Sequence, residues 1–447
     1  MPADGTAGQG PPCKATRVRP FLRLSMIKHT RNLLSLVMIQ GSNAALPLLV
    51  FPYVLGVVGA QHYADIVVTE AFSVLLITVI LYSFEIDGVA AVTGLRPERD
   101  RAQLSKIFSR ILVLRMTLFT VAAPMLVAGL SLFRPELTHI AAWWMLIPLS
   151  YALQPTWLYQ GLQANGIPAV CTLLSRAVAV VLILLLVKRP DDFLLVPAIM
   201  GVMYALGSVA MLAFAMAGLG IRPTRVRWGE LMQMIRAGKE IFLGNVGVAL
   251  YRDSNVLLLG FLGLHGAPIA AYSLAEKTTK AVQAVIRPLN QLFFPKAVLV
   301  TQAANSPNRD VFVRLLRLTW PQLGALVTIW LALMAAVPIL RQHVPAIGQI
   351  QELDQVMLFM SLMALGTLFG VCNFMFGSAG LNTLGQKRAL LGGILFAAVV
   401  SVIATATLGG VYGAIGAAIS FTLSEGVLFA TIARKYYRGE RLVNVAS

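Results

Sequence analysis

Long apolar stretches alternate with short polar segments along almost the whole chain. A transmembrane helix needs about 20 consecutive apolar residues, and twelve stretches of roughly that length can be read from the sequence. The predicted spans cover residues 32–57, 64–90, 107–132, 139–161, 166–187, 193–217, 240–263, 268–295, 315–338, 353–380, 388–408 and 411–433. The pattern therefore predicts an all-α polytopic membrane protein with twelve transmembrane helices.

The composition supports a lipid environment. Of the 447 residues, 57% are hydrophobic and 12% are charged, and the mean hydropathy is +0.76. A soluble domain carries about 25% charged residues. So much apolar surface requires lipid around it.

The net charge of +17 is distributed unevenly. Most Lys and Arg residues lie before the first span, in the segments 94–115, 218–240 and 296–317, and in the C-terminal tail, whereas the alternate loops hold Arg134, Lys188, Arg189 and Arg341. Positive charge is enriched in cytoplasmic loops, so both termini are predicted to be cytoplasmic. The basic loops then face anionic lipid headgroups, and no nucleic-acid partner is expected.

Short motifs recur in order with nearly constant spacing, which suggests an internal repeat of six spans. The echoes are Leu55 to Gly59 with Leu259 to Gly263, Arg99-Asp100 with Arg309-Asp310, and Gln160-Gly161 with Ala379-Gly380. An even number of spans gives both halves the same orientation, and parallel halves around a central path are a known transporter architecture. We therefore expect two parallel six-helix bundles around a central cavity.

The predicted organisation has five parts. They are a disordered cytosolic tail at 1–31, an N-terminal bundle at 32–217, a basic cytoplasmic linker at 218–239, a C-terminal bundle at 240–436 and a second cytosolic tail at 437–447. The first tail lacks the apolar segment of a signal peptide, and Met26 is an alternative start to Met1. The spacing of Cys and His residues predicts neither a disulfide framework nor a metal or cofactor site.

A polar stripe runs along the eighth predicted span. At about 100° per residue, six polar side chains fall on one helical face, while the opposite positions are apolar. The stripe consists of Glu276, Lys280, Gln283, Arg287, Asn290 and Gln291. Charge in the bilayer is costly, so the stripe is expected to line an aqueous cavity. The alternative is a structural ion pair between Glu276 and Lys280, which are four residues apart.

Other predicted spans add polar residues at similar depth. Asn245 and Arg252 share a face of span seven, Gln40 and Asn43 are one turn apart in span one, and Glu70 in span two is a counterpart of Glu276. The deep charges comprise five basic and four acidic residues, so we expect a slightly cationic cavity. They are Arg176, Arg252, Lys277, Lys280 and Arg287 against Glu70, Asp253, Glu276 and Glu425.

The sequence lacks the motifs expected of a protein driven directly by ATP and of an enzyme. In GLNTLGQKR, starting at Gly380, Gln386 stands where a phosphate-binding loop requires Lys, so ATP is not expected to drive this chain directly. The outer loops are short and offer only Asp191-Asp192 as catalytic candidates. We therefore expect a transporter rather than an enzyme, with a membrane enzyme of glycan assembly as the weakest alternative.

Several stretches resemble bacterial polysaccharide flippases of the Wzx type, which belong to the multidrug/oligosaccharidyl-lipid/polysaccharide exporter superfamily. The resemblance spans roughly residues 30 to 435, and its most specific part is GNVGVALYRDSNVLLLG followed by YSLAEKTTKAVQAVIRPLNQLFFP. It implies a multi-pass protein of the bacterial inner membrane. It also implies a substrate, an oligosaccharide joined by pyrophosphate to undecaprenol, which is moved to the periplasmic leaflet.

These inferences together give a set of expected roles. Arg287, Lys280, Lys277 and Arg252 are predicted to hold the pyrophosphate, because Arg and Lys make charge-assisted hydrogen bonds to phosphate oxygens. Polar side chains are predicted to contact the sugar, namely Gln40, Asn43, Asn245, Gln283 and Asn290. Glu276 and Glu70 are candidates for coupling to H⁺ or Na⁺, and polysaccharide polymerase machinery is a candidate partner. A drug or cation antiporter of the same superfamily is the main alternative.

Overall fold

The computed structural model describes residues 19–304, 306–343, 348 and 350–446, with side chains at 38, 41, 48–304, 306–343, 348 and 350–437. Helices make up nearly all of this described part, and none of its residues forms a strand. The first half contains α1 Arg19–Leu81, α2 Phe84–Val92, α3 Arg101–Phe133, η1 Pro135–Leu137, α4 Thr138–Trp144, α5 Leu146–Leu153, α6 Thr156–Gly161, α7 Gly166–Leu186, η2 Pro190–Leu194 and α8 Leu195–Gly218. The second half contains α9 Trp228–Arg252, α10 Asn255–Phe261, α11 Ala267–Gln302, α12 Arg309–His343, α14 Leu353–Cys372, the π-helix η3 Asn373–Leu381, α15 Lys387–Tyr412 and α16 Ala414–Ala446.

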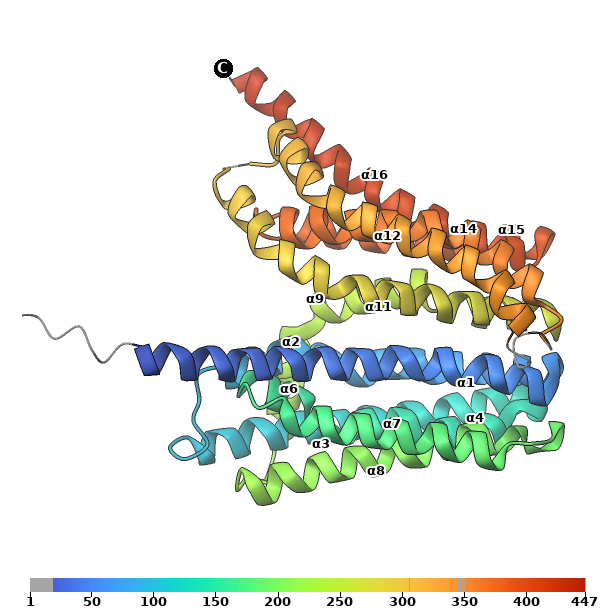
Figure 1. Ribbon diagram of the computed structural model, residues 1–447. Helices are drawn as coiled ribbons and strands as arrows, with labels where there is room; N and C mark the ends of the chain where they lie inside the picture. The colour runs from blue at the N-terminus through green and yellow to red at the C-terminus, as the bar shows by residue number, and fades with distance from the viewer. Residues whose placement is uncertain (1–18, 305, 344–347, 349, 447) are drawn as a thin grey trace, which may run out of the picture.

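Two groups of helices stand side by side, one from each half of the chain (Figure 1). The blue to green helices α1 to α8 form one group, and the yellow to red helices α11 to α16 form the other. Helix α1 packs along α11 where the groups meet. The two groups diverge towards the end where α1 begins and α16 ends. This all-α polytopic fold has the two-bundle arrangement that the sequence predicts.

The helices follow the twelve predicted spans, although several spans are broken. By length and apolarity, eight segments in the described part of the chain could cross a membrane. The fourth span is divided into α4, α5 and α6, and α9 and α11 are less apolar than the eight segments because charged and other polar side chains interrupt them. Polar groups inside a membrane are tolerated where they face a cavity or another helix, so these exceptions indicate where the interior is polar.

Glycine occupies the last position of both copies of the first repeated motif, at Gly59 and Gly263. Gly59 has φ +79° inside α1, where the first predicted span gives way to the second, and Gly263 has φ +80° after α10. Both values lie in the region that other residues adopt only with strain. The matched positions thus share a positive φ, which is consistent with an internal repeat.

The predicted disorder of the first tail is wrong in part. Residues 19–31 belong to α1 and are helical rather than disordered, and α16 continues through the predicted tail to Ala446. Glycine and proline, which disfavour helix, are concentrated before residue 21, and the segment from there to residue 40 contains neither. The remaining part of the first tail, 1–18, lies outside the described residues.

The predicted linker is held against α3. The backbone N–H groups of Arg222 and Thr224 donate to Ser105 Oγ at 3.1 Å and to Ser109 Oγ at 2.8 Å. Arg110 donates from Nη2 to Glu230 Oε1 at 2.6 Å, and this hydrogen bond is the main cause of a lowered pKa of Glu230. The connection between the halves is therefore fixed on the first half, and its last part is already the start of α9.

Candidate functional site

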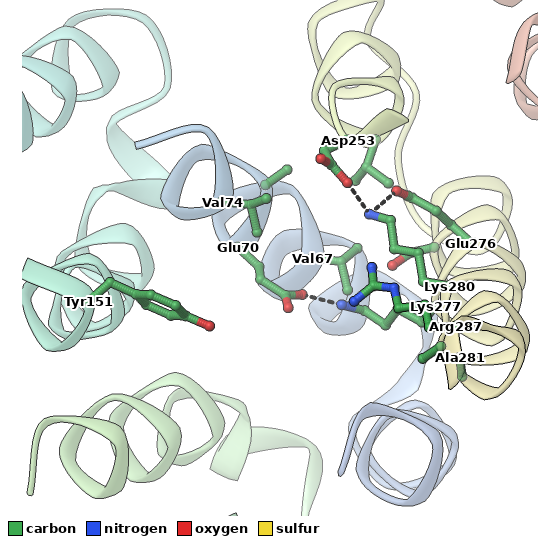
Figure 2. A pocket seen from close by; sticks show the side chains of 14 residues that line it. Val67, Glu70, Val74, Tyr151, Asp253, Glu276, Lys277, Lys280, Ala281 and Arg287 are labelled. Carbon is green, nitrogen blue, oxygen red and sulfur yellow. Dashed lines mark hydrogen bonds and ion pairs between the residues drawn. The ribbon is translucent and has the colours of Figure 1, made fainter. Parts of the chain in front are cut away.

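A cavity of about 370 Å³ lies between the two halves (Figure 2). We call it the central cavity. The first half contributes α1 and Tyr151 of α5, and the second half contributes α10, α11 and the break between α9 and α10. The lining residues are Val67, Glu70, Ala71, Val74, Tyr151, Asp253, Val256, Ser273, Glu276, Lys277, Lys280, Ala281, Ala284 and Arg287.

The charged half of the polar stripe of α11 lines this cavity. Glu276, Lys280 and Arg287 line it, together with Lys277. On the other side of the helix, Val285 and Leu292 have 64% and 63% of their surface exposed. Exposed large apolar side chains are suited to lipid contact. Helix α11 thus separates lipid from a polar interior.

One ion pair joins the two halves across the central cavity. Lys277 Nζ of α11 lies 2.5 Å from Glu70 Oε2 of α1, as Figure 2 shows. The same ammonium lies 3.8 Å from the centre of the Phe51 ring, also in α1. A cation over an aromatic face gains further electrostatic attraction. Lys277 is therefore fixed to the first half by two contacts.

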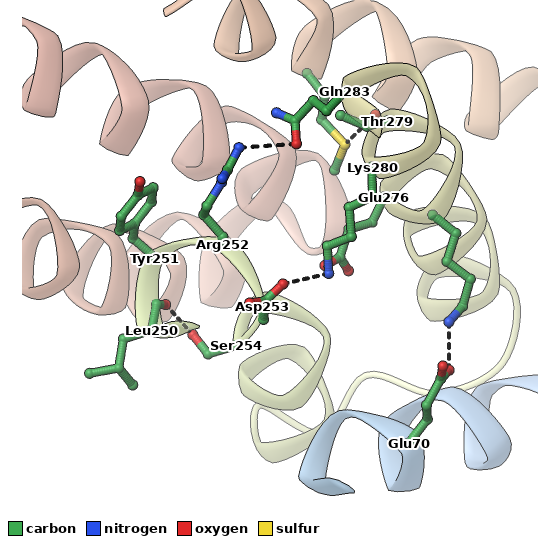
Figure 3. A network of polar contacts seen from close by, with 12 residues as sticks. Glu70, Leu250, Tyr251, Arg252, Asp253, Ser254, Glu276, Thr279, Lys280 and Gln283 are labelled. Atoms are coloured by element: carbon green, nitrogen blue, oxygen red, sulfur yellow. Dashed lines mark hydrogen bonds and ion pairs between the residues drawn. The ribbon is translucent and has the colours of Figure 1, made fainter. Parts of the chain in front are cut away.

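Lys280 contacts two acids of the second half. Its Nζ lies 2.7 Å from Asp253 Oδ1 and 2.6 Å from Glu276 Oε1 (Figure 3). Asp253 is positioned by the break between α9 and α10, where the helix is interrupted at residues 253 and 254. The Lys280 side chain remains 42% exposed. The structural ion pair considered from the sequence is thus present, and the same lysine also lines the cavity.

The expected excess of positive charge does not occur in the central cavity. Its described lining contains three acids, Glu70, Asp253 and Glu276, and three cations. The other deep cations lie elsewhere. Arg176 is buried with its guanidinium 3.0 Å from the centre of the Tyr204 ring, and Arg252 pairs with an acid of the second half. The number of charged residues deep in the predicted spans does not give the charge of the cavity, because depth along a helix does not show which face a side chain occupies.

A second cavity of about 230 Å³ lies within the second half, and we call it the C-terminal cavity. It is lined by Arg252, Gln283, Ile286, Arg287, Asn290, Gln291, Thr367, Gly370, Val371 and Phe374. Arg287 lines both cavities. Residues expected to bind pyrophosphate and residues expected to bind sugar are thus distributed over two adjoining spaces.

A buried polar network positions Arg252 in the C-terminal cavity. Arg252 Nε lies 3.1 Å from Glu425 Oε1, and its Nη2 donates to Gln283 Oε1 at 3.0 Å (Figure 3). Asn373 donates to the other oxygen of Glu425 at 2.7 Å. The Glu425 side chain is only 1% exposed. The buried carboxylate of Glu425 therefore has a cationic partner, as a buried charge requires.

Asn245, which is also expected to contact sugar, lies apart from Gln283 and Asn290. The Asn245 amide donates to the Tyr82 carbonyl at 2.7 Å, and Asn245 is absent from the described linings of both cavities. Tyr82 has φ +50° in the break between α1 and α2, so its carbonyl lies outside a regular helix. The side chains of Gln40 and Asn43 lie outside the described residues.

Sequence reasoning missed a buried arginine. Arg115 is 1% exposed, with Nη2 2.7 Å from Glu85 Oε1 and Nη1 donating to the Gln154 carbonyl at 3.0 Å. Its place in the segment 94–115 groups it with the basic residues that are predicted to be cytoplasmic. The missed signal is that Arg115 follows the apolar residues of ILVL in α3. Arg115 holds α3 to α2 and to the end of α5.

Metal binding finds no support in the described side chains. No group of three or more His, Cys, Asp or Glu residues in this part of the chain is arranged to hold a metal ion. The acids of the central cavity are instead engaged with Lys277 and Lys280. The arrangement can bind an anion through its cations, or exchange a proton or cation at its carboxylates.

Known proteins resemble this chain in sequence. A family model described as polysaccharide biosynthesis protein matches residues 29–298. A protein of Escherichia coli (strain K12), provisionally named an O-antigen transporter, is 22% identical over 60% of this chain and 64% of its own length. A protein of the same name from Shigella dysenteriae is 22% identical over 60% of this chain and 66% of its own length. The chain thus spans slightly less than two thirds of these relatives.

Solved structures share the fold. An inward-facing multidrug resistance MATE family transporter of the MOP superfamily aligns with a TM-score of 0.63, at 14% identity, over 92% of this chain and 96% of its own. The lipid II flippase MurJ in an inward closed conformation aligns with a TM-score of 0.64, at 12% identity, over 89% of this chain and 87% of its own. Because the family model covers more than half of the sequence, the chain belongs to the polysaccharide biosynthesis protein family.

Proposed function

We propose that this chain is a flippase. Its substrate would be an oligosaccharide repeat unit joined by pyrophosphate to undecaprenol, moved from the cytoplasmic to the periplasmic leaflet of the bacterial inner membrane. The central cavity carries the proposal, because it brings Lys277, Lys280 and Arg287 together between two halves of a transporter fold. The relatives' names support transport of surface polysaccharide precursors rather than an enzymatic reaction.

The headgroup of such a lipid needs a polar path. Each unpaired polar group costs several kcal/mol in hydrocarbon, on the order of 4–8 kcal/mol for transfer to an alkane, and an ion costs far more. The polyprenyl tail is apolar and can remain in the bilayer. Arg287, Lys280 and Lys277 would bind the pyrophosphate in the central cavity, with Arg252 nearby in the C-terminal cavity. Gln283 and Asn290 would contact the first part of the glycan.

The shape of the molecule supports alternating access between the two leaflets. The halves diverge towards the end where α1 begins and α16 ends, and the positive-inside rule places that end in the cytoplasm. Both termini would then be cytoplasmic, and the described conformation would receive substrate from the inside. A phosphate competing for Lys277 would weaken its ion pair with Glu70, which joins the halves at the central cavity.

Reconstituted protein tests this function. Liposomes would contain a fluorescent undecaprenyl-pyrophosphate-linked oligosaccharide, and the fraction of sugar that becomes accessible to an external glycosidase would be followed with time. We expect the protein to accelerate exposure relative to protein-free liposomes. If the protein exports a cationic dye and leaves the lipid-linked sugar unmoved, it is an antiporter instead, and the flippase proposal is wrong.

Ion coupling is assigned to Glu276 in this proposal. The Glu276 side chain is 6% exposed and shares Lys280 with Asp253, so protonation or cation binding at Glu276 would release Lys280 for the substrate. Glu276→Gln is expected to transport without stimulation by an imposed proton or sodium gradient. The measurement is the rate of sugar exposure in liposomes with and without each gradient. Glu70 is the second candidate, through its pair with Lys277.

The substitution Asp354→Asn is the control for the gradient experiment on Glu276→Gln. Asp354 pairs with Arg341 at 2.9 Å, but its side chain is 78% exposed. Asp354→Asn should therefore keep the response of the wild-type protein to the gradient. A Glu276→Gln protein that responds to both gradients as the wild type does would remove Glu276 from the coupling mechanism.

A further inference from the structure

Two amide side chains that line the C-terminal cavity each have a buried polar atom without a hydrogen-bond partner. They are Gln283 Nε2 and Asn290 Oδ1, and Asn290 has only 9% of its surface exposed. A buried polar atom left unpaired costs about 1–3 kcal/mol. Such atoms at the wall of a cavity indicate that a polar ligand supplies the missing hydrogen bonds.

The remaining lining narrows the class of ligand. Ile286, Val371 and Phe374 form apolar walls, and no acid is among the described residues that line this cavity. A cation would therefore find no carboxylate in that lining, and an acyl chain would leave both amides unpaired. Arg252 is already matched by Glu425 at 3.1 Å. A neutral ligand that carries several hydroxyl groups fits better than either.

The size of the cavity suits one sugar ring. A volume of 230 Å³ corresponds to about seven or eight water molecules at ~30 Å³ each. Sugar hydroxyls both donate and accept hydrogen bonds, so they can satisfy an amide nitrogen and an amide oxygen whichever way each amide is turned. The face of a sugar ring is apolar and can lie against Phe374.

We propose that the C-terminal cavity is a monosaccharide subsite, which takes the sugar attached directly to the pyrophosphate. This inference rests on the proposed function. Arg287 lines both cavities, so a phosphate bound by Arg287 in the central cavity would direct its first sugar towards Gln283 and Asn290. The subsite lies entirely within the second half, whereas the phosphate site is shared by both halves.

The binding test compares two lipids on the full-length protein in nanodiscs. One is undecaprenyl pyrophosphate, and the other is undecaprenyl pyrophosphate bearing a single hexose or N-acetylhexosamine. We expect the wild-type protein to bind the sugar-bearing lipid about tenfold more tightly, because two buried amides gain partners. Asn290→Ala should reduce this preference to nearly none and leave the affinity for undecaprenyl pyrophosphate unchanged.

A second variant tests occupancy of the cavity without removing a polar group. A methyl group added at Gly370 would lie 3.5 Å from Glu425 Oε1, 3.6 Å from Gln283 Nε2 and 3.7 Å from Arg252 Nη2, which are ordinary contact distances. Gly370→Ala should therefore fold normally and lower the preference for the sugar-bearing lipid. Gly324→Ala is the matched control, because a methyl group there would meet nothing within 4 Å.

Gln322→Ala controls for the loss of a buried amide in the same half. Gln322 is fully buried and also has an unpaired oxygen, but it lies outside the described lining of both cavities, so the preference should persist. If the wild-type protein binds both lipids equally, or if Asn290→Ala and Gly370→Ala keep the preference, the subsite is disproved. If the wild-type protein binds neither lipid, the proposed function itself fails.

Discussion

Replacing Arg287 by alanine is expected to lower the transport rate by on the order of 100-fold while the protein still inserts into the membrane. Arg287 lines both the central and the C-terminal cavity, so it is placed where a phosphate joins its first sugar. A guanidinium can bind two phosphate oxygens at once. Each charge-assisted hydrogen bond is worth about 1.5–3 kcal/mol, and losing two at the lower end of this range, about 3 kcal/mol in all, accounts for an effect of this size. The measurement is the initial rate of sugar exposure in liposomes.

Two further variants separate charge from geometry. Arg287→Lys keeps the charge but loses the two-point contact, and it should retain an intermediate rate. Arg314→Ala removes an exposed arginine of α12 that lies outside both described linings, and it should transport normally. Full restoration of surface polysaccharide by Arg287→Ala in a flippase-deficient strain would exclude Arg287 from phosphate binding. Lys280→Ala is expected to lose function in the same assay.

The largest effect on stability is expected at Glu425. Glu425→Leu would leave Arg252 and Asn373 without their buried partner, and breaking a buried ion pair costs about 3–5 kcal/mol. Because Arg252 retains Gln283 and is 29% exposed, we expect a loss near the lower end, about 3 kcal/mol. The measurement is the unfolding temperature of the detergent-solubilised protein and its yield from membranes.

A second substitution at Arg252 tests whether the broken ion pair with Glu425 causes the loss of stability. Arg252→Leu combined with Glu425→Leu removes both charges, so the double variant should be more stable than Glu425→Leu alone. Glu425→Gln keeps a side chain that can hydrogen-bond to Asn373, and it should lie between the wild-type protein and Glu425→Leu. A Glu425→Leu protein that unfolds at the wild-type temperature would show that the network does not stabilise the second half.

Helical periodicity predicts the polar face of α11 well. The stripe needs only the sequence of one helix and a fixed angle per residue, and both the cavity-facing and the exposed residues follow it. The pair between Glu276 and Lys280 is equally local, since the two residues are one turn apart. Span positions follow from apolar length in the same way.

Contacts between distant segments could not be predicted from the chain alone. The pair between Lys277 and Glu70 depends on how α1 docks against α11. Asn245 and Arg252 lie on one face of α9, yet Asn245 binds the Tyr82 carbonyl and Arg252 reaches Glu425. These partners come from other helices, and the breaks at residues 82–83 and 253–254 expose backbone groups that a regular helix would hide.

The balance of three acids and three cations in the described lining of the central cavity has an electrical consequence for the proposed cycle. An empty site of zero formal charge leaves the charge of a bound pyrophosphate uncompensated. The inside-negative voltage of a bacterial membrane would then drive the loaded carrier outward, by about 2.3 kcal/mol per charge for each 100 mV. Protons taken up by Glu70 or Glu276 would reduce the net negative charge of the loaded site and with it the electrical driving force. The number of carboxylates protonated per cycle would therefore set how strongly export depends on voltage.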